Sequence, residues 1–372
     1  MHGPVTAVGE STTLSERKRR AGQRLILGLP GPEIDIVTRK LIQLIRPAGF
    51  ILFARNVEDP AQVKELNREL ASLVPPELPA LLSVDQEGGR VMRIRKGATA
   101  FPPLRWLGNC ADESLTTRYA EALADEVAAM GFNLNWAPVA DVDSNPKNPV
   151  IGDRSFGRDP KEVAHQVSIF VRATQARGIL CCAKHFPGHG DTDQDSHLTL
   201  PKVEKERPDL EQCELLPFRA AVQAGVAGVM SAHVVFPAFD EDYPATMSPA
   251  ILRDWLRGPL GFEGMVVSDD MEMQAVKDRW PLETVLEKAC SATVDLFLVC
   301  KEQERQVAFF EALVRLQEED LRQHTLAEDS FKRVMATRER FFLRRAPPPG
   351  LDVLDRIEHR MLAELVRARG GE

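Results

Sequence analysis

Short apolar runs recur along the chain and alternate with longer stretches in which apolar residues repeat at helical spacing. A continuous apolar run bounded by turn residues is typical of a buried strand, whereas a helical repeat is typical of an amphipathic helix. Strands that alternate with helices predict parallel βαβ units. The predicted strands are Leu25–Leu29, Phe50–Phe53, Ala80–Val84, Asn133–Val139, Ile179–Ala183, Gly228–Ala232, Met265–Val267 and Leu296–Val299.

Eight such strands in one chain predict an α/β protein built on a single (β/α)8 barrel of the TIM type, with a C-terminal helical extension. A doubly wound open sheet is the structural alternative. The helices between the strands are clearest at Ala61–Leu73, Leu115–Met130, Glu162–Arg177, Leu210–Ala224, Leu282–Ala292 and Gln303–Leu316.

The two ends of the chain depart from the barrel pattern. Residues 1–20 look like a loose N-terminal extension, and Pro347–Gly350 breaks the chain after a helix. We therefore expect an extension at 1–20, a barrel at 21–345 and a helical tail at 346–372. Within the tail, Leu351–Arg369 has an apolar stripe that we expect to pack on the core, with a dimer contact as the alternative. The stripe consists of Leu354, Ile357, Met361, Leu362 and Leu365.

Polar side chains follow six of the predicted strands at the point where each strand ends. Barrel enzymes carry their catalytic groups at this end of the strands, and a purely structural barrel does not need charge at each one. We therefore expect these side chains to surround one site. They are Arg55 and Asn56, then Asp85, Gln86 and Glu87, then Asp141, Lys184 and His185, His233, and Asp269 and Asp270.

The segment with the most titratable groups is 184–197, which reads KHFPGHGDTDQDSH. An apolar strand leads into Lys184 and His185, and a glycine-rich loop then carries Asp195 and His197. A loop of this kind is typical of a catalytic site, and a polar surface turn is the alternative. An imidazole gains and loses a proton near neutral pH, and Asp195 can orient the ring of His197. His197 is therefore a candidate general acid/base, with an ordinary surface histidine as the alternative.

The segment GMVVSDD, residues 264–270, ends an apolar strand with two carboxylates. A carboxylate held rigidly in a barrel mouth can attack an acetal carbon and form a glycosyl ester, or it can bind a metal or backbone amides. Successive strand residues point to opposite faces, so we expect only one of the two to face the pocket. We expect Asp269 to be that residue, and Asp270 to pair with arginine or backbone groups outside the pocket.

Two further segments offer groups that bind sugar hydroxyls. Asp85 opens the sequence DQEGGR, whose glycines allow a sharp turn beside a ligand, and Arg93 follows shortly after. Arg154 lies in a second glycine-bounded loop, GDRSFG. Either arginine can equally brace acidic loops, and the spacing alone does not decide between the two roles.

Histidines 185, 189, 197 and 233, with nearby aspartates, raise the alternative of a metal cluster. Their spacing matches no helix-borne site with two histidines one turn apart, and no thiolate joins them. We therefore expect neither a metal ion nor any other cofactor.

Charge and apolar content narrow the class of partner. The 372 residues carry a formal net charge of −8, which argues against nucleic acid as a partner. No run approaches the roughly 18 apolar residues that span a bilayer, and the first twenty residues lack the apolar core of a signal peptide. None of the six cysteines forms a C-x-x-C pair. We expect a cytoplasmic protein, monomeric or weakly dimeric, whose partner is a small glycan.

Taken together, these segments resemble glycoside hydrolase family 3, and most closely its single-domain bacterial β-N-acetylhexosaminidases of the NagZ type. The resemblance runs from about Arg24 to Leu298, and the first twenty residues and the tail after Ala346 match no block. The KHFPGHG…DSH block is the most specific. The other matching blocks are GFILFARN, SVDQEGGRVMR, NLNWAPVADV, IGDRSFG, SAHVVFPAFD and GFEGMVVSDDMEM.

The resemblance implies retaining hydrolysis of terminal β-linked N-acetylglucosamine through a covalent glycosyl–aspartate intermediate. In cytoplasmic members the substrate is GlcNAc linked to 1,6-anhydro-N-acetylmuramic acid, a fragment from cell-wall recycling. The alternatives are a β-glucosidase or xylosidase, a GlcNAc phosphorylase, and a muropeptide-binding sensor without enzymatic activity. The resemblance implies Asp269 as nucleophile, His197 as acid/base assisted by Asp195, and Asp85, Arg93, Arg154, Lys184 and His185 as sugar-binding residues.

Overall fold

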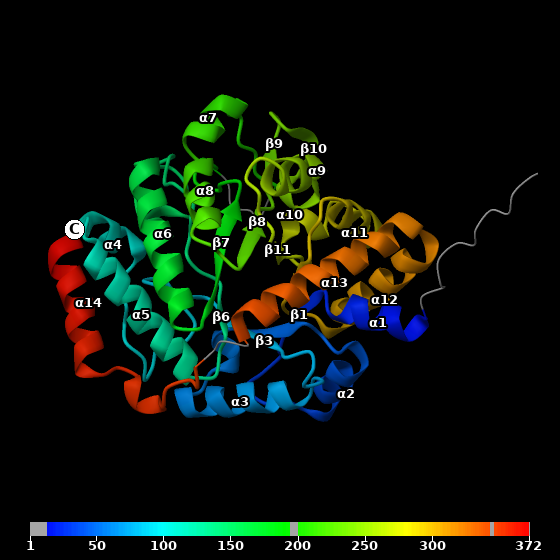
Figure 1. Cartoon of the computed structure of the whole chain (residues 1–372), viewed down its shortest axis with the longest axis horizontal. Helices are drawn as coiled ribbons and strands as arrows, with labels where there is room; N and C mark the ends of the chain where they lie inside the picture. The colour runs from blue at the N-terminus through cyan, green and yellow to red at the C-terminus, as the bar shows by residue number, and fades with distance from the viewer. Residues whose placement is uncertain (1–12, 194–199, 343–345, 372) are drawn as a thin grey trace, which may run out of the picture.

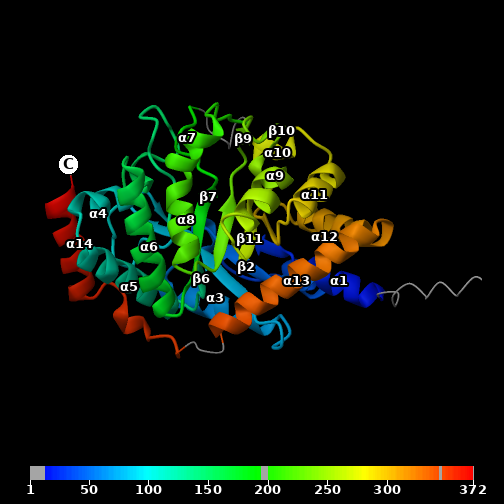
Figure 2. The same cartoon turned by 45° about the horizontal axis from the view of Figure 1, so that its top comes forward.

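Eight parallel strands close into a barrel at the centre of the molecule, and helices surround it (Figures 1 and 2). The computed structural model describes residues 13–193, 200–342 and 346–371. The strand order is β1-β12-β11-β8-β7-β6-β3-β2, and β1 pairs with both β12 and β2, so the sheet is closed. The barrel prediction is confirmed, and the open sheet is excluded. The strands are β1 (Leu25–Gly28), β2 (Gly49–Leu52), β3 (Leu81–Val84), β6 (Leu134–Asn135), β7 (Leu180–Phe186), β8 (Gly228–Ser231), β11 (Met265–Asp270) and β12 (Leu296–Val299).

Two small antiparallel ribbons lie outside the barrel sheet. One joins β4 (Gln86–Gly88) to β5 (Val91–Met92), and the other joins β9 (Val235–Phe236) to β10 (Asp240–Pro244). Gly88 and Gly89 both have positive φ in the turn of the first ribbon, a conformation that glycine adopts without strain. This turn brings the chain back on itself, so that Arg93 returns to the side chain of Asp85.

The surrounding helices begin at clear caps. Asp59, Asp112 and Asp159 each precede a helix and accept backbone N–H groups of its first turn. The described ranges contain no helix that is long and apolar enough to cross a membrane. The helices around the barrel are α2 (Ile36–Ile45), α3 (Pro60–Ser72), α4 (Leu104–Cys110), α5 (Glu113–Ala129), α6 (Pro160–Ala176), α7 (Arg207–Gln212), α8 (Leu215–Gln223), α9 (Pro249–Ile251), α10 (Gln274–Lys277), α11 (Leu282–Ser291) and α12 (Gln303–Glu319). Shorter helical turns are η1 (Ala54–Asn56), η2 (Gly152–Arg154), η3 (Ala245–Met247), η4 (Leu252–Arg257) and η5 (Leu351–Val353).

The helix predicted at Leu210–Ala224 is divided into α7 and α8 by Cys213 and Glu214. Glu214 is fully buried and accepts bonds from Ser144 Oγ at 2.9 Å and Lys205 Nζ at 2.7 Å. Because a buried carboxylate needs such partners, the chain turns inward here. The prediction of one continuous helix is therefore wrong at this point.

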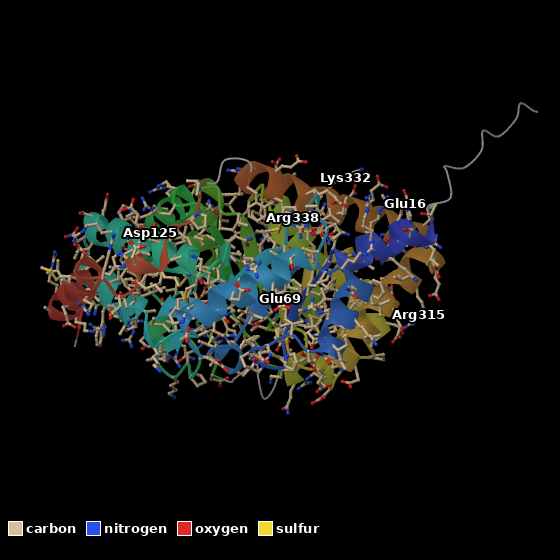
Figure 3. The ribbon with its side chains drawn as sticks, turned by 90° about the horizontal axis from the view of Figure 1, so that it is seen from below. Glu16, Glu69, Asp125, Arg315, Lys332 and Arg338 are labelled. Carbon is tan, nitrogen blue, oxygen red and sulfur yellow. The ribbon has the colours of Figure 1, made fainter. Side chains whose placement is uncertain are left out.

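Helix α13 (Leu321–Phe342) lies across the N-terminal end of the barrel, which Figure 3 shows from below. Val334, Phe341 and Phe342 pack against the apolar side chains inside the barrel. Arg338 donates from Nη1 to Gln23 Oε1 and from Nη2 to the carbonyl of Ala48, both at 2.6 Å. Gln23 and Ala48 precede β1 and β2, so this helix closes the barrel opposite the strand ends predicted to carry the site.

Helix α1 (Leu14–Gly22) begins at a capping box formed by Thr13 and Glu16 and packs against α2, α12 and α13. The described part of the predicted loose extension, residues 13–20, is therefore largely helical. The sequence did not predict helix α1, because it is polar and rich in arginine and only Ala21 and Gly22 are buried.

The tail forms α14 (Ile357–Gly370), which packs against α4 and α5 (Figure 1). The prediction that the apolar stripe of the tail packs on the core is confirmed for Leu354 and Leu362 but is wrong for Ile357 and Met361, which are 61% and 66% exposed. The helix buries Leu362, Ala363, Val366 and His359, whose Nδ1 lies 2.7 Å from the buried carboxylate of Glu126. The buried face of the helix therefore combines apolar side chains with one hydrogen bond to α5.

Candidate active site

A pocket of about 350 Å³ opens at the C-terminal ends of the strands. This volume lies at the lower end of the range for ligand pockets, which suits one small ligand better than an extended chain. Six of the predicted site residues line this one pocket, and they come from five different strands or the loops that follow them. They are Asp85, Arg93, Arg154, Lys184, His185 and Asp269.

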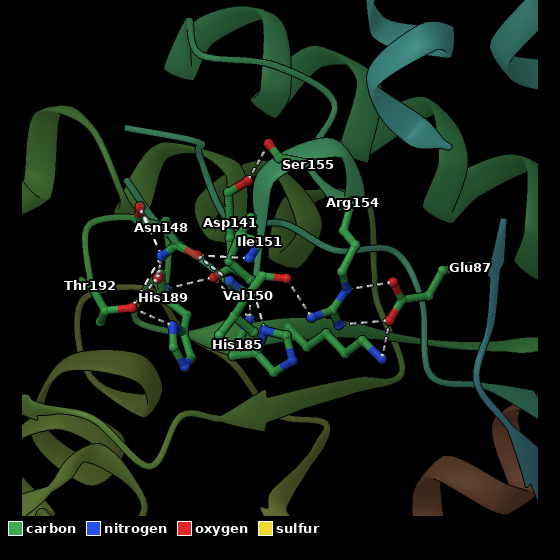
Figure 4. A network of polar contacts seen from close by, with 12 residues as sticks. Glu87, Asp141, Asn148, Val150, Ile151, Arg154, Ser155, His185, His189 and Thr192 are labelled. Atoms are coloured by element: carbon green, nitrogen blue, oxygen red, sulfur yellow. Dashed lines mark hydrogen bonds and ion pairs between the residues drawn. The ribbon is translucent and has the colours of Figure 1, made fainter. Parts of the chain in front are cut away.

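Paired charges form one wall of the pocket. Lys184 Nζ lies 2.8 Å from Asp85 Oδ1 and 2.7 Å from Glu87 Oε1. Arg154 binds Glu87 through two parallel hydrogen bonds of 2.9 Å (Figure 4). Arg93 Nη2 lies 3.0 Å from Asp85 Oδ2. We call these five side chains, Asp85, Glu87, Arg93, Arg154 and Lys184, the charged wall.

Four groups of the charged wall carry their charge at neutral pH, namely Asp85, Glu87, Arg154 and Lys184. Burial alone would raise the pKa of Glu87, but Arg154 and Lys184 outweigh it and hold that pKa far below its usual value. Burial would also raise the pKa of Asp85, but Lys184 and Arg93 outweigh this effect and lower that pKa. The pKa of Lys184 is raised because Asp85 and Glu87 outweigh the effect of its burial. Such a wall presents fixed donors and acceptors to a ligand's hydroxyl groups.

The sequence indicates Glu87 and Asp141 only as polar residues after strands. It does not reveal the contacts that they make in the structure. Asp141 is fully buried, and its Oδ2 lies 2.7 Å from His185 Nδ1. The Asp141 carboxylate also accepts the backbone N–H groups of His185 and His189. Burial would raise the pKa of Asp141, but His185 outweighs it and lowers that pKa. A carboxylate only accepts, so Nδ1 of His185 carries the proton, and Nε2 is the atom left for a ligand.

His189 also lines the pocket but lies deeper in the protein. Its Nδ1 is 2.9 Å from Thr192 Oγ1, and Asn148 Nδ2 donates to its carbonyl at 2.8 Å (Figure 4). Burial, with a smaller effect from His185, lowers the pKa of His189 to about 4. The ring is therefore neutral at neutral pH.

Asp269 and Asp270 both line the pocket, so the expectation that only one would do so is wrong. The pairing of β11 with β12 shifts register between Val267 and Asp270, which breaks the simple alternation of faces. The backbone N–H of Asp270 donates to Asp269 Oδ1 at 2.8 Å and thereby orients that carboxylate. Burial is the main cause that raises the pKa of Asp270 to about 6, and Glu272 and Asp269 add to it.

The predicted acid/base pair, Asp195 and His197, lies outside the described residues. Within the described ranges, no three histidine, cysteine, aspartate or glutamate side chains gather where a metal ion could be held. His233, one of the histidines considered for a metal, places its Nε2 3.2 Å from the carbonyl of Asp270 and so supports the end of β11.

Comparison with known families gives this arrangement its context. The model of the glycosyl hydrolase family 3 N-terminal domain matches residues 23–337. The chain belongs to glycosyl hydrolase family 3. A relative named beta-hexosaminidase, from Nitrosomonas eutropha, is 38% identical over 286 residues, which cover 75% of this chain and 80% of that one.

Solved structures of family 3 members share the fold. A β-N-acetylglucosaminidase from Paenibacillus sp. superposes with a TM-score of 0.90 at 38% identity, over 97% of this chain and 69% of that one. NagZ from Neisseria gonorrhoeae, solved with N-trifluoroacetyl-D-glucosamine, superposes with a TM-score of 0.76 at 29% identity, over 93% of this chain and 98% of that one. The family 3 domain therefore spans almost the whole barrel, including the charged wall and β11.

Proposed function

We propose that this family 3 glycoside hydrolase is a retaining β-N-acetylglucosaminidase that removes terminal GlcNAc through a covalent intermediate on Asp269. The observation that carries the proposal is the position of Asp269, whose strand ends in the same small pocket as the charged wall and His185. A pocket of about 350 Å³ favours a single terminal sugar over an internal one.

The described side chains supply binding and the nucleophile. Asp85 and Glu87 offer acceptors and Lys184 and Arg154 offer donors, so a sugar hydroxyl that enters the charged wall finds both partners. Because these groups are already held by one another, little reorganisation is needed when the sugar binds. His185 adds one further ring nitrogen, which Asp141 fixes in orientation.

The proposed reaction has two steps that restore the starting enzyme. An oxygen of Asp269 attacks the anomeric carbon, and the bond to the leaving oxygen breaks as His197, assisted by Asp195, gives that oxygen a proton. In the second step His197 takes a proton from water, whose oxygen attacks the anomeric carbon and releases Asp269. The roles of His197 and Asp195 rest on the family resemblance of the 184–197 segment.

The names of the relatives support the choice of sugar. The Nitrosomonas relative is named beta-hexosaminidase, the Paenibacillus structure is a β-N-acetylglucosaminidase, and the Neisseria NagZ structure holds an N-acylated glucosamine. We further propose that the natural substrate is GlcNAc linked to 1,6-anhydro-N-acetylmuramic acid and that the enzyme works in the cytoplasm. These two points rest on the resemblance to NagZ-type proteins.

Parallel assays on nitrophenyl β-GlcNAc and nitrophenyl β-glucoside, with and without phosphate, test the proposal. A site that hydrogen-bonds a substituent rejects an analogue that lacks it, so we expect at least about a hundredfold preference for GlcNAc in kcat/KM. Equal rates on the two glycosides would indicate a broad β-glucosidase. Trapping with a 5-fluoro GlcNAc donor, followed by peptide mass spectrometry, should place the label on Asp269, and a label on Asp270 would exclude this nucleophile.

A further inference from the structure

Three cations lie toward the mouth of the pocket, of which Arg93 belongs to the charged wall and the other two do not. Arg93 and Lys301 line the pocket, and Arg55 follows β2 on the same side. Arg55 and Lys301 are exposed, whereas Lys184 is buried. We call Arg55, Arg93 and Lys301 the cationic rim.

The contacts of Arg55 join the members of the rim. Its guanidinium donates to the carbonyl of Leu29 at 2.8 Å and to the carbonyl of Cys300, the residue directly before Lys301. The guanidinium groups of Arg55 and Arg93 lie 4.6 Å and 5.3 Å from the centre of the Phe53 ring. Loops after β2 and β5 thus bring two like charges to one aromatic side chain, and Lys301 follows the carbonyl that Arg55 binds after β12.

Two of the three rim cations have no ion-pair partner among the described side chains. Arg93 is paired with Asp85, but no carboxylate in the described ranges forms an ion pair with Arg55 or Lys301. Asp270 and Glu272 act on Arg55 only from a longer distance. Both carboxylate oxygens of Glu272 already accept backbone N–H groups, those of Lys301 and Glu302.

Neighbouring like charges repel one another, and a bound anion relieves that repulsion. The charged wall and Asp269 line the deep part of the pocket. The proposed function places the terminal sugar there. The group attached to that sugar must then extend toward the mouth, past Arg93, Arg55 and Lys301. A negative charge on this leaving group would meet the rim.

We propose that Lys301 and Arg55, with Arg93, bind a carboxylate on the leaving group and so select glycosides with an acidic aglycone. This inference rests on the proposed function and deepens it. Lys301 is the member best suited to a test, because its exposed side chain makes no hydrogen bond or ion pair in the described ranges, whereas Arg55 also joins two strand ends.

The test uses 4-carboxyphenyl β-GlcNAc and its neutral counterpart, 4-carbamoylphenyl β-GlcNAc. Comparing the acid-to-amide ratio of kcat/KM between enzyme variants cancels the different reactivity of the two phenols. In Lys301→Gln we expect this ratio to fall about fivefold, the scale of one partly exposed ion pair, and to fall further in Lys301→Glu. The wild-type ratio should also decrease as salt is added, because salt screens exposed charges.

Lys40→Gln is the matched control, since Lys40 is an exposed lysine on α2 that does not line the pocket, and its ratio should equal that of the wild type. An unchanged ratio in both Lys301 variants would overturn the proposal, as would an equal loss on the acid and the amide. If inorganic phosphate accelerates turnover of nitrophenyl β-GlcNAc and Lys301→Gln abolishes the acceleration, the rim binds an acceptor instead, and the proposal also falls.

The same pair of aglycones on β-glucose separates this inference from the proposed function. If only the glucosides are cleaved, the choice of GlcNAc is wrong, but their acid-to-amide ratio still tests the rim. If the GlcNAc pair is cleaved with no dependence on Lys301, the proposed function stands and the rim does not select the leaving group.

Discussion

Each end of the barrel holds an arginine largely away from solvent, and the two are held in different ways. At the site end, Arg154 binds the carboxylate of Glu87, which also contacts Lys184. At the closed end, Arg338 is 1% exposed and donates to neutral acceptors, the oxygens of Gln23 and Ala48 and the sulfur of Met335. Burial alone would lower the pKa of either group; Glu87 reverses this for Arg154, whereas the pKa of Arg338 falls to about 9.

This difference separates a binding function from a structural one. A buried pair of charges is weak evidence for stability, because desolvation offsets most of the attraction. A connected set of several pairs around a pocket is better explained by a ligand that needs both donors and acceptors. At the closed end, Arg338 holds helix α13 through bonds to neutral groups, and Arg333 of the same helix pairs with Asp295, just before β12. Among the residues that the structure describes, no pocket lined by such pairs lies there, so these contacts are explained by packing of the helix.

Asp269→Asn should give the largest effect of any change at the site end. The amide is a poor nucleophile, so we expect kcat to fall by about 10⁴-fold or more while the melting temperature stays close to that of the wild type. The assay uses nitrophenyl β-GlcNAc, with circular dichroism as the check on folding. A loss below about tenfold would mean that another group attacks the sugar.

Glu87→Gln should change both activity and stability, since it leaves Lys184 and Arg154 with one carboxylate fewer. Removing one partner of a buried set costs about 3 kcal/mol in the free energy of unfolding. We expect kcat/KM to fall about a hundredfold, because Lys184 and Arg154 then lose their fixed orientation toward the sugar. Urea unfolding and steady-state kinetics measure the two effects, and a change in stability alone would restrict Glu87 to a structural role.

Arg338→Met should lower the free energy of unfolding by about 2 kcal/mol, the cost of losing hydrogen bonds made by a buried charged donor. No carboxylate is left without its partner, so the loss should be smaller than for Glu87→Gln. Because Arg338 lies at the far end of the barrel, kcat/KM per folded molecule should stay within about twofold of the wild type. A tenfold loss of kcat/KM would show that the two ends are coupled.

Much of this comparison could be anticipated from the sequence, and the misses have physical causes. Strands buried on both faces are continuous apolar runs, which is why all eight were found. The pocket position of Asp270 depends on a register shift that no periodicity reveals. Glu87 accepts from Arg154 and Asp141 from His185, both distant in the sequence, so the sequence shows the two carboxylates only as polar strand ends.

The closed end was harder to predict because its contacts do not follow an apolar pattern. Helix α13 carries charged residues along much of its length, and its central contacts are made by Arg333 and Arg338. The tail stripe was predicted only in part for a related reason, since the buried face of α14 also carries His359, which hydrogen-bonds with Glu126 of a distant helix. The positions of His197 and Asp195 stay predictions.

His189 should make the site end sensitive to acid. Its pKa is about 4 in the folded protein and about 6.5 in an unfolded chain, so the unfolded state binds more protons between these values. Stability that is present above pH 6.5 is therefore lost as the pH falls, by about 1 kcal/mol between pH 7 and pH 5.5. Unfolding curves of His189→Gln should lack this contribution, whereas those of the exposed His165→Gln should keep it. Arg338→Met should also keep the contribution of His189. Its free energy of unfolding, plotted against pH, should therefore run parallel to that of the wild type.

Asp270 should act in the opposite direction, with the smallest effect of the five. Its pKa of about 6 lies above the ordinary value of 3.8, so the folded state binds more protons between pH 4 and pH 6. Acidification from pH 7 to pH 5.5 therefore stabilises the fold through Asp270 by somewhat less than about 1 kcal/mol, and partly hides the loss through His189. In Asp270→Asn this compensation is absent, so the free energy of unfolding should fall more steeply with acid than in the wild type. Equal slopes would mean that Asp270 is ionised throughout this range, and the site end would then owe its response to acid to the histidines alone.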